Sequence, residues 1–397
     1  MRHRIIVLGA GYAGAASAGY LARHLHCDDV EITVVNAEPD FVERIRLHQL
    51  AAGHQLPRHR LTDMFAGTGI RLRVARVTAV DADARTVTVA DDEGTDQLGY
   101  DTLLYTLGSS VSDGGVPGVR EHAFDVTSEP SARSVRERLA ALGENARVLV
   151  VGGNLTAIES ATEIAEARPD LRVSLVTTDQ LGGWLGTSAR QHMLRAFDRL
   201  GVPVHEHATV TRVGASEVVT SGGATFPTDM TVWAAGFAAH PIAAASGLAV
   251  EENGRVTVDD MMRSVSHPGV YAAGDSVLAV GGNGRALPMS CATAGFTRMR
   301  ATAAIIRDLT GHEAGLTLPL AYFGNCVSLG ENDGIFQMVD GTGRSKAWSL
   351  RGRSAAYYKR FVYRNTAWNM HNPTYGLPTW GRRVTAAPHR ASERVTD

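Results

Sequence analysis

Apolar residues near the start of the chain form two short runs separated by a stretch with helical spacing. Residues 5–8 (IIVL) are the first run, GAGYAG follows at once, and AASAGYLARHL then spaces its apolar residues as a helix does. Residues 31–36 (EITVVN) are the second run. This order predicts a strand, a glycine loop, a helix and a further strand, with the length of one βαβ unit.

The same order recurs in the middle of the chain. RVLVVGGN predicts a strand and a glycine loop, and LTAIESATE continues as a helix. Residues 172–178 and 231–237 then predict buried strands, with an amphipathic helix over residues 190–200 between them. Two dinucleotide-binding folds in one chain are the simplest account of this recurrence.

The remaining patterns are shorter and more varied. Residues 73–89 and 208–226 alternate as β-hairpins, and residues 100–109 predict a buried strand. Beyond residue 316, strand-like segments precede a basic, aromatic helix. A tail beginning at RRVTAAPHRASE is expected to be disordered.

Together these elements predict an α/β chain with two Rossmann-like dinucleotide-binding domains, the first interrupted by the second, and a C-terminal α+β segment. We expect the first domain at residues 1–115 and 256–315, the second at residues 116–255, and the C-terminal segment at residues 316–397.

The first glycine loop has the residues that a dinucleotide diphosphate needs. Gly9 permits the tight turn, Gly11 lets the backbone approach the diphosphate, and Gly14 lets helix and strand pack closely. The N-terminus of the following helix then faces the diphosphate. An acid about 20 positions further on usually bonds the ribose. Here that strand ends in Asn36, whose amide oxygen can accept instead.

The second glycine loop departs from this pattern. Gly152 and Gly153 are present, but Asn154 replaces the second glycine of the motif and Ala157 the third. Alanine is often accepted there, whereas asparagine adds a side chain where the diphosphate approaches. We expect a nicotinamide nucleotide to bind here weakly, with Asn154 either crowding a phosphate or donating to it. The next strand ends in neither an acid, which would favour NADH, nor an arginine, which would hold the 2′-phosphate of NADPH. The choice between NADH and NADPH therefore stays open.

Two further positions lie where ligands of open α/β sheets bind. Residues 269–276 (GVYAAGDS) predict a short strand whose carboxyl end carries Gly274 and Asp275. A long helix beginning at about Ala292 offers the N–H groups of its first turn to an electron-rich partner.

Composition narrows the classes of protein. The chain has 397 residues, 44% of them hydrophobic, and a formal net charge of −2, which favours neither nucleic acid nor an anionic membrane surface as a partner. Its three cysteines form no CxxC or CxxxxC pair, so a redox-active disulfide is excluded and a reducing cytoplasm fits best. No run of about 18 apolar residues occurs, so we expect no membrane span, and we predict no metal site.

Five motifs in a fixed order are more specific than any one of them. They are GAGYAG, YTLGS, VVGGNLTAIE, WAAGF and VYAAGDS. Over nearly the whole chain they resemble the FAD/NAD(P)-dependent pyridine nucleotide oxidoreductases, flavoproteins with two dinucleotide-binding domains. The lack of a cysteine pair and the segment DFVERIRLHQLAAG make the chain similar to the type II NADH:quinone oxidoreductase branch and its soluble relatives.

This resemblance implies FAD in the first domain and NAD(P)H in the second. The residues that it places near FAD are Gly9, Gly11, Gly14, Asn36, Arg44, Arg46, Val77, Thr106, Leu107, Gly108, Gly274, Asp275 and Ala292. Those that it places near the nicotinamide nucleotide are Gly152, Gly153, Asn154, Glu159 and Gly236.

Within the flavin set the resemblance implies particular roles. Val77 would lie near the adenine, Asp275 would bond the ribitol, and the helix from Ala292 would point at the pyrimidine end of the flavin. Arg44, Arg46 and His48 would lie at the isoalloxazine edge; the alternative is that they are surface residues on a loop. Hydride transfer through stacked rings needs no protein acid or nucleophile, so we assign no catalytic residue.

Three functions stay open. The first is an FAD-dependent NAD(P)H dehydrogenase that reduces a quinone-like or other small acceptor. The second is a biosynthetic flavoenzyme that acts directly on an organic substrate and has a degenerate nicotinamide site. The third is a redox-responsive binding protein that holds flavin. CATAGFTRMRA lacks the glutamine pattern of the quinone-binding helix of the membrane enzymes. Three roles also stay open for the aromatic residues of segment 355–380: capping an acceptor pocket, making a homodimer contact, or packing onto the flavin domain.

Overall fold

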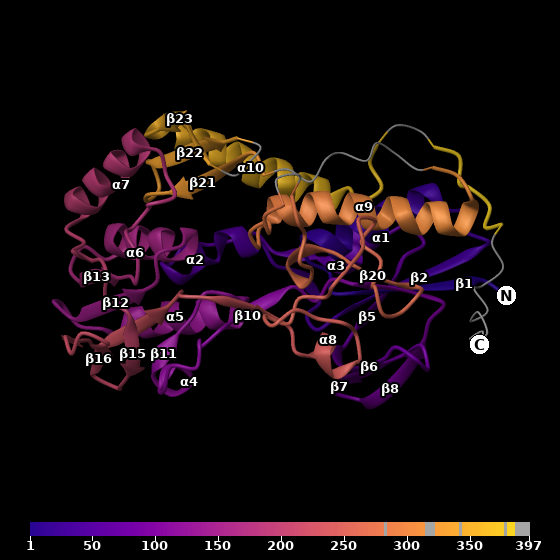
Figure 1. The fold of residues 1–397 in the computed structure, drawn as a ribbon, viewed down its shortest axis with the longest axis horizontal. Coiled ribbons are helices and arrows are strands. Elements are labelled where there is room, and N and C mark those ends of the chain that lie inside the picture. Colours follow the sequence, from indigo (N-terminus) through magenta and orange to yellow (C-terminus); the bar gives the residue numbers. More distant parts are fainter. Residues whose placement is uncertain (282–283, 314–321, 341–343, 377–378, 386–397) are drawn as a thin grey trace.

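The structure, a computed structural model, describes residues 1–281, 284–313, 322–340, 344–376 and 379–385. Two parallel sheets with their helices lie at opposite ends of an elongated molecule (Figure 1). The C-terminal strands and helix α10 (Arg353–His371) lie along one side and contact both ends. None of the helices in the described residues is long and apolar enough to cross a bilayer.

The first sheet has five parallel strands in the order β20, β9, β1, β2, β5. Their bounds are Val270–Ala272, Thr102–Tyr105, His3–Leu8, Val30–Asn36 and Arg71–Val74. The apolar run of β1 is buried throughout, as expected for a parallel strand covered on both faces. Helix α1 (Tyr12–His24) follows the glycine loop as predicted, and the long helix α9 (Cys291–Thr310) packs beside it.

The second sheet is also parallel, in the order β11, β18, β12, β13, β14. Its strands are Ala123–Phe124, Met230–Trp233, Arg147–Val151, Arg172–Val176 and Val204–His205. Its helices are α5 (Glu129–Ala141), α6 (Leu155–Ala167) and α7 (Thr187–Leu200). The strand order reverses between β18 and β12, and in the first sheet between β9 and β1, so each glycine loop starts at a switch point where ligands bind. The predicted α/β class with two Rossmann-like sheets is confirmed.

Smaller elements complete both ends. Each predicted hairpin is confirmed and gains a third antiparallel strand. These strands are β6 (Arg76–Asp81), β7 (Thr86–Asp91), β8 (Gly94–Gly99), β15 (Val210–Val213), β16 (Glu217–Thr220) and β17 (Thr225–Pro227). The pairs are β3 (Asp40–Phe41) with β4 (His59–Arg60) and β10 (Ser109–Val111) with β19 (Phe237–Ala239). Short helices are α2 (Leu47–Ala51), α3 (Leu61–Phe65), α4 (Val119–His122) and α8 (Ile242–Ala245), with 3₁₀ turns at Arg44–Arg46 and Gly274–Ser276.

The C-terminal segment forms the antiparallel sheet of β21 (Gly324–Ser328), β22 (Gly334–Val339) and β23 (Ser345–Arg351) before α10. Both the strands and the basic, aromatic helix were predicted. Disorder of the tail is wrong for residues 382–385, because Arg382 and Val384 hydrogen-bond to residues 24–29. The rest of that tail lies outside the described residues.

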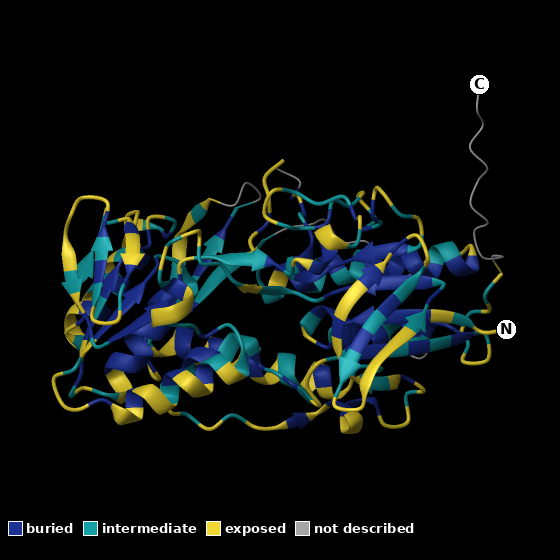
Figure 2. Ribbon diagram, turned by 90° about the horizontal axis from the view of Figure 1, so that it is seen from below, coloured by how far each residue is buried: buried dark blue, intermediate teal, exposed yellow. Residues whose placement is uncertain are grey.

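Two large hydrophobic cores match the two sheets (Figure 2). Leu47 and Leu50 of α2 belong to the second core, although they come from the N-terminal part of the chain. Val327 and Ile335 of the C-terminal sheet join the same core, whereas Met370 of α10 joins the first. Segments distant in sequence therefore contribute to both cores and join the two ends of the molecule.

Candidate functional site

The glycines of the first loop differ in how much space surrounds the position of a Cβ atom. A Cβ on Gly9, whose φ is +91°, would lie 2.7 Å from the Thr106 carbonyl oxygen, and a Cβ on Gly14 would lie 1.8 Å from the Gly9 oxygen. A Cβ on Gly11 would meet no atom within 4 Å. Internal packing thus explains Gly9 and Gly14 but leaves Gly11 facing open space, which fits the close approach of a dinucleotide diphosphate.

The N-terminus of α1 is open to an anion. Its N-cap is Gly11, which supplies no side-chain hydrogen bond, so the helix dipole and first-turn N–H groups can serve a diphosphate. Asn36 stands at the end of β2 as predicted, but its amide oxygen already accepts from the Ala10 N–H at 2.8 Å, while its amide nitrogen donates to the Glu38 oxygen at 2.8 Å. Asn36 therefore shapes the loop, and one lone pair remains for a ribose hydroxyl.

Polar groups gather where β9 and β20 end. The Ser109 hydroxyl donates to Asp275 Oδ2 at 2.7 Å, and Arg44 Nη2 donates to the Ser109 carbonyl at 2.9 Å. The Gly108 N–H donates to the Ser276 hydroxyl at 3.0 Å. The structure therefore brings together Arg44, Gly108 and Asp275, three of the predicted residues, from segments more than 60 positions apart.

Four other predicted residues, Thr106, Leu107, Gly274 and Val77, make hydrogen bonds or packing contacts within the first domain. The buried Thr106 hydroxyl donates to the Leu8 carbonyl at 2.6 Å, and the Gly274 N–H donates to Thr297 of α9 at 2.9 Å. Leu107 is half-buried against the first core. Val77 is buried in β6, beside the end of β2.

Helix α9 begins at Cys291, one residue before the predicted Ala292. Its N-cap Ser290 accepts a hydrogen bond from the Thr293 N–H at 3.1 Å. One of the first-turn donors is therefore already used, and the others remain for a ligand.

In the second glycine loop, the side chain of Asn154 makes two hydrogen bonds to the backbone. Asn154 is the N-cap of α6: its Oδ1 accepts from the Ala157 N–H at 3.0 Å, and its Nδ2 donates to the Ala234 carbonyl at 2.7 Å. A Cβ on Gly152 would lie 2.6 Å from the same Ala234 oxygen, and one on Gly153 would lie 2.4 Å from Thr177 Oγ1. These two glycines are needed by packing, and Asn154 occupies a donor that a diphosphate would use.

Gly236 lies just beyond β18, where the chain returns to the first domain. Its carbonyl accepts from the Ser112 N–H at 3.0 Å, and the Trp233 indole donates to the Ser112 carbonyl at 2.8 Å. A Cβ on Gly236 would lie 3.6 Å from the Ser112 side chain. Gly236 thus pairs the two chain segments that connect the sheets.

Glu159 belongs to a buried ionic network. It forms an ion pair with Lys359 of α10, accepts from the Ser328 N–H at 2.9 Å, and lies 3.6 Å from His48 Nδ1. Burial lowers the pKa of His48 to about 4, although Glu159 acts in the opposite direction. Burial would also lower the pKa of Lys359, but Glu159 and Tyr363 leave it raised. The network holds the C-terminal helix onto α6.

Arg44, Arg46 and His48 make different contacts within the protein, and their place at the isoalloxazine edge stays a prediction. Arg44 joins Ser109, whereas Arg46 contacts Glu43 at 3.3 Å and lies over the Tyr363 ring. His48 is buried beside Glu159. The alternative that they are surface residues on a loop is wrong, because His48 is buried and both arginines are half-buried. The 3₁₀ turn that precedes α2 turns consecutive side chains in different directions.

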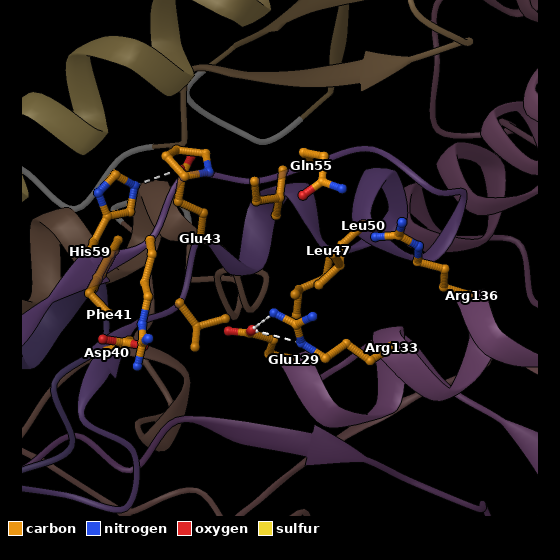
Figure 3. Close-up of a pocket in the computed structure, with 14 residues that line it drawn as sticks. Asp40, Phe41, Glu43, Leu47, Leu50, Gln55, His59, Glu129, Arg133 and Arg136 are labelled. Carbon is orange, nitrogen blue, oxygen red and sulfur yellow. Dashed lines mark hydrogen bonds and ion pairs between the residues drawn. The ribbon is translucent and has the colours of Figure 1, made fainter.

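A cleft of about 250 Å³ lies between the β3–β4 hairpin, α2 and α5 (Figure 3). Charged residues line it in pairs, Arg58 with Asp40 and Arg133 with Glu129, and the apolar Leu47 and Leu50 also line it. None of its lining residues belongs to either glycine loop. Its lining includes Glu43 and Leu47, which flank Arg44 and Arg46 in the sequence.

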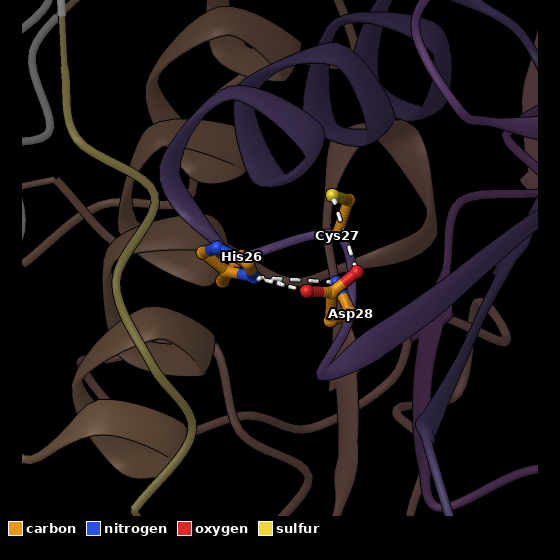
Figure 4. Close-up of side chains that lie close together, drawn as sticks. All are labelled: His26, Cys27 and Asp28. Carbon is orange, nitrogen blue, oxygen red and sulfur yellow. Dashed lines mark hydrogen bonds and ion pairs between the residues drawn. The ribbon is translucent and has the colours of Figure 1, made fainter.

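Three consecutive residues after α1 place possible metal ligands close together. Ligand atoms of His26, Cys27 and Asp28 lie within 4.8 Å of one another (Figure 4). Cys27 and Asp28 are exposed, and the Arg383 guanidinium lies 3.9 Å from Asp28. A nearby positive charge opposes cation binding, so this cluster carries no metal assignment.

Sequence reasoning missed the partners that come from afar. Ser328 and Lys359 lie in no motif. Ser109 ends the YTLGS motif and Tyr363 lies among the aromatic residues 355–380, but the sequence did not show which groups they contact. Only one signal was available: LTAIESATE carries two glutamates four residues apart, which places both on one helix face.

The chain is similar to known proteins over most of its length. Residues 3–297 match the family model described as pyridine nucleotide-disulphide oxidoreductase. An NADH dehydrogenase-like protein of Mycobacterium tuberculosis is 30% identical over 354 residues, 84% of this chain and 87% of the relative. A type II NADH:quinone oxidoreductase of Staphylococcus epidermidis is 25% identical over 398 residues, 91% of this chain and 94% of the relative.

Among solved structures, the sulfide:quinone oxidoreductase of Aquifex aeolicus superposes with a TM-score of 0.75 at 18% identity, covering 94% of this chain and 92% of that one. This likeness supports the fold.

Proposed function

Because the chain belongs to the pyridine nucleotide-disulphide oxidoreductase family, we propose that it holds FAD without a covalent bond and passes electrons from NAD(P)H to a quinone-like or other small acceptor. We assign FAD to residues 1–115 and 256–315 and the nicotinamide nucleotide to residues 116–255. The observation that carries the proposal is Gly11, which faces open space above an uncapped helix N-terminus.

The residues at the first switch point fit FAD. Gly11 and the N-terminus of α1 would hold the diphosphate, and Asp275 with Ser109 would hold the polar chain beyond it. Bound FAD would supply a ring that accepts and donates electrons, while the protein binds and orients it. The free thiols of Cys27, Cys291 and Cys326 suit a reducing compartment and leave the flavin as the redox group.

The acceptor is proposed from the relatives and from the cysteine count. Relatives named NADH:quinone oxidoreductase cover nearly the whole chain, and the three cysteines include no closely spaced pair for disulfide exchange. A small two-electron acceptor is therefore the simplest partner.

The test compares two glycine variants. Gly11→Ala should fold normally, since its Cβ has space, yet should lose bound FAD, since that Cβ stands where the diphosphate approaches. Gly143→Ala, at an exposed glycine that also has space and lies far from the loop in sequence, is the matched control and should keep its flavin. Absorbance of the purified proteins reports the flavin. A colourless wild type that gains no flavin on adding FAD would refute the proposal.

A second function has one observation in its favour. Asn154 caps α6 and uses a donor that NAD(P)H would need, which suits a flavoenzyme that acts directly on an organic substrate. Anaerobic mixing with NADH or NADPH separates the two. Loss of the oxidised-flavin absorbance within the time of turnover supports the dehydrogenase, and an unchanged flavin at any nucleotide concentration supports the alternative.

A further inference from the structure

The cleft between the β3–β4 hairpin, α2 and α5 carries one positive charge that the protein does not pair. Arg136 of α5 lines this cleft, is half-buried, and makes no hydrogen bond or ion pair with any described residue. Arg133, one turn earlier on the same helix, donates to Glu129 Oε1 at 3.0 Å. A half-buried charge without a partner has lost part of its hydration and gained no counter-ion, which favours an anion beside it.

The acidic residues of the cleft already have cationic partners. The ion pairs are Asp40 with Arg58, Glu129 with Arg133, and Glu43 with Arg46. No carboxylate that lines the cleft is therefore left to neutralise Arg136. Because each negative charge is offset by its own arginine, the charge of Arg136 makes the cleft complementary to an anionic ligand.

Arg136 shares its end of the cleft with a second unpaired donor. Arg136, Leu50 and Gln55 lie at one end of the cleft, whereas Asp40 and His59 lie at the other (Figure 3). Gln55 is exposed, and its side-chain amide makes no hydrogen bond to the described residues. A guanidinium group and an amide N–H both donate to carboxylate oxygens. This end of the cleft can therefore hold a carboxylate by charge and by hydrogen bonding.

Apolar side chains supply a surface for the rest of the ligand. Leu47, Leu50 and Leu56 line the cleft, and Leu56 is only half-buried. Apolar surface beside a charged group favours an amphipathic ligand, because a hydrocarbon that covers the leucines removes them from water. The cleft has a volume of about 250 Å³. This is slightly less than the roughly 300–1,000 Å³ of sites for drug-sized molecules, so the ligand must be short.

We propose that the cleft binds a small amphipathic carboxylate, with its charged end on Arg136 and Gln55 and its apolar part on the three leucines. The ligand contacts α2 from the N-terminal part of the chain and α5 from the second dinucleotide-binding fold. It therefore stabilises the arrangement in which these two helices lie together. This inference goes beyond the proposed function, because none of the lining residues belongs to either glycine loop and no electron transfer is involved.

The experiment titrates the purified full chain, with FAD added, with butanoate, hexanoate and octanoate in a calorimeter. We expect one site per chain. The affinity should rise about fourfold with each methylene that the leucines cover. Hexanamide has the chain of hexanoate without its charge and should bind about tenfold more weakly or less tightly still, because it makes no charge-assisted hydrogen bond to Arg136.

Variants assign the two parts of the site. Arg136→Gln should weaken hexanoate binding about ten- to a hundredfold, whereas Arg136→Lys keeps the charge and should retain most of it. Leu56→Ser should lower the ratio of octanoate to butanoate affinity. Arg138→Gln is the matched control: Arg138 is exposed on the same helix, donates to the Asp229 carbonyl at 2.9 Å, and does not line the cleft. Its hexanoate affinity should be unchanged, and thermal unfolding checks that each variant is folded.

Three results would overturn this proposal. They are no heat of binding with any of the three carboxylates, equal affinities for hexanoate and hexanamide, and a folded Arg136→Gln that binds hexanoate as tightly as the wild type. Displacement of hexanoate by NADH would also overturn it, since the carboxylate would then occupy the nicotinamide site. A flavin that neither NADH nor NADPH reduces would count against the proposed function and leave these titrations unaffected.

Discussion

The Asn154 cap makes a quantitative prediction about nicotinamide binding. Its amide oxygen holds the Ala157 N–H at 3.0 Å and its amide nitrogen holds the Ala234 carbonyl at 2.7 Å. A diphosphate that uses the first turn of α6 must displace the first of these bonds and clear the side chain. Displacement costs about 0.5–1.5 kcal/mol, and crowding brings the total to about 1–2 kcal/mol.

We therefore expect Asn154→Gly to tighten NAD(P)H binding about five- to thirtyfold, since about 1.4 kcal/mol corresponds to a factor of ten. The same change should lower the free energy of unfolding by about 1–2 kcal/mol, because glycine caps slightly less well and the bond to Ala234 is lost. Calorimetric titration with NADH and with NADPH measures the binding, and thermal unfolding measures the stability.

Two further variants assign the effect. Asn154→Ser keeps an oxygen that can cap Ala157 but loses the bond to Ala234, so its binding should resemble the wild type. Ser128→Gly removes the cap of α5, where the Ser128 hydroxyl accepts from the Ser131 N–H at 3.2 Å, and should affect stability without affecting binding. Weaker binding by Asn154→Gly would refute the reasoning and show that the amide itself holds the nucleotide.

Three other results are expected. Asp275→Ala should weaken FAD retention about ten- to a hundredfold, since a hydrogen bond to a charged group contributes about 1.5–3 kcal/mol; unchanged retention in equilibrium dialysis would exclude Asp275 from the site. Lys359→Met should destabilise the fold by about 3–5 kcal/mol by leaving Glu159 buried and unpaired, and adding Glu159→Gln should recover most of the loss in denaturant unfolding. The pKa of Glu163 rises from 4.5 to about 7 on folding, so the folded state binds more protons between these values and the free energy of unfolding falls by about 3 kcal/mol as pH rises through that window. Glu163→Gln should therefore lose less stability than the wild type between pH 5 and pH 8. Parallel curves of unfolding free energy against pH would contradict this assignment.

The local pattern of the sequence determined both sheets' central strands and their glycine loops. A buried parallel strand needs a continuous apolar run, as in β1 and β12, and a tight turn before a helix needs glycine, as at Gly9 and Gly152. These requirements are met within a few neighbouring residues, so they are visible without knowing the fold. The hairpins and the long helix α9 were predictable for the same reason.

The role of Asn154 could not be predicted from its loop. The sequence showed an asparagine in place of a glycine, but not that its side chain would turn to the Ala157 N–H and the Ala234 carbonyl. The second of these bonds spans 80 positions, and it exists because β18 lies next to β12 in the sheet. Strand neighbours are set by topology, which local periodicity does not encode.

The buried ionic network was decided by tertiary structure alone. Glu159 and Lys359 are 200 positions apart, and neither residue has a local environment that requires the other. They meet because α10 packs over the C-terminal sheet, which in turn joins the second core through Val327 and Ile335. Burial of apolar surface brings these elements together without regard to their charged groups, because it is non-directional. The charged groups that become buried must then pair with one another at the positions where this packing places them.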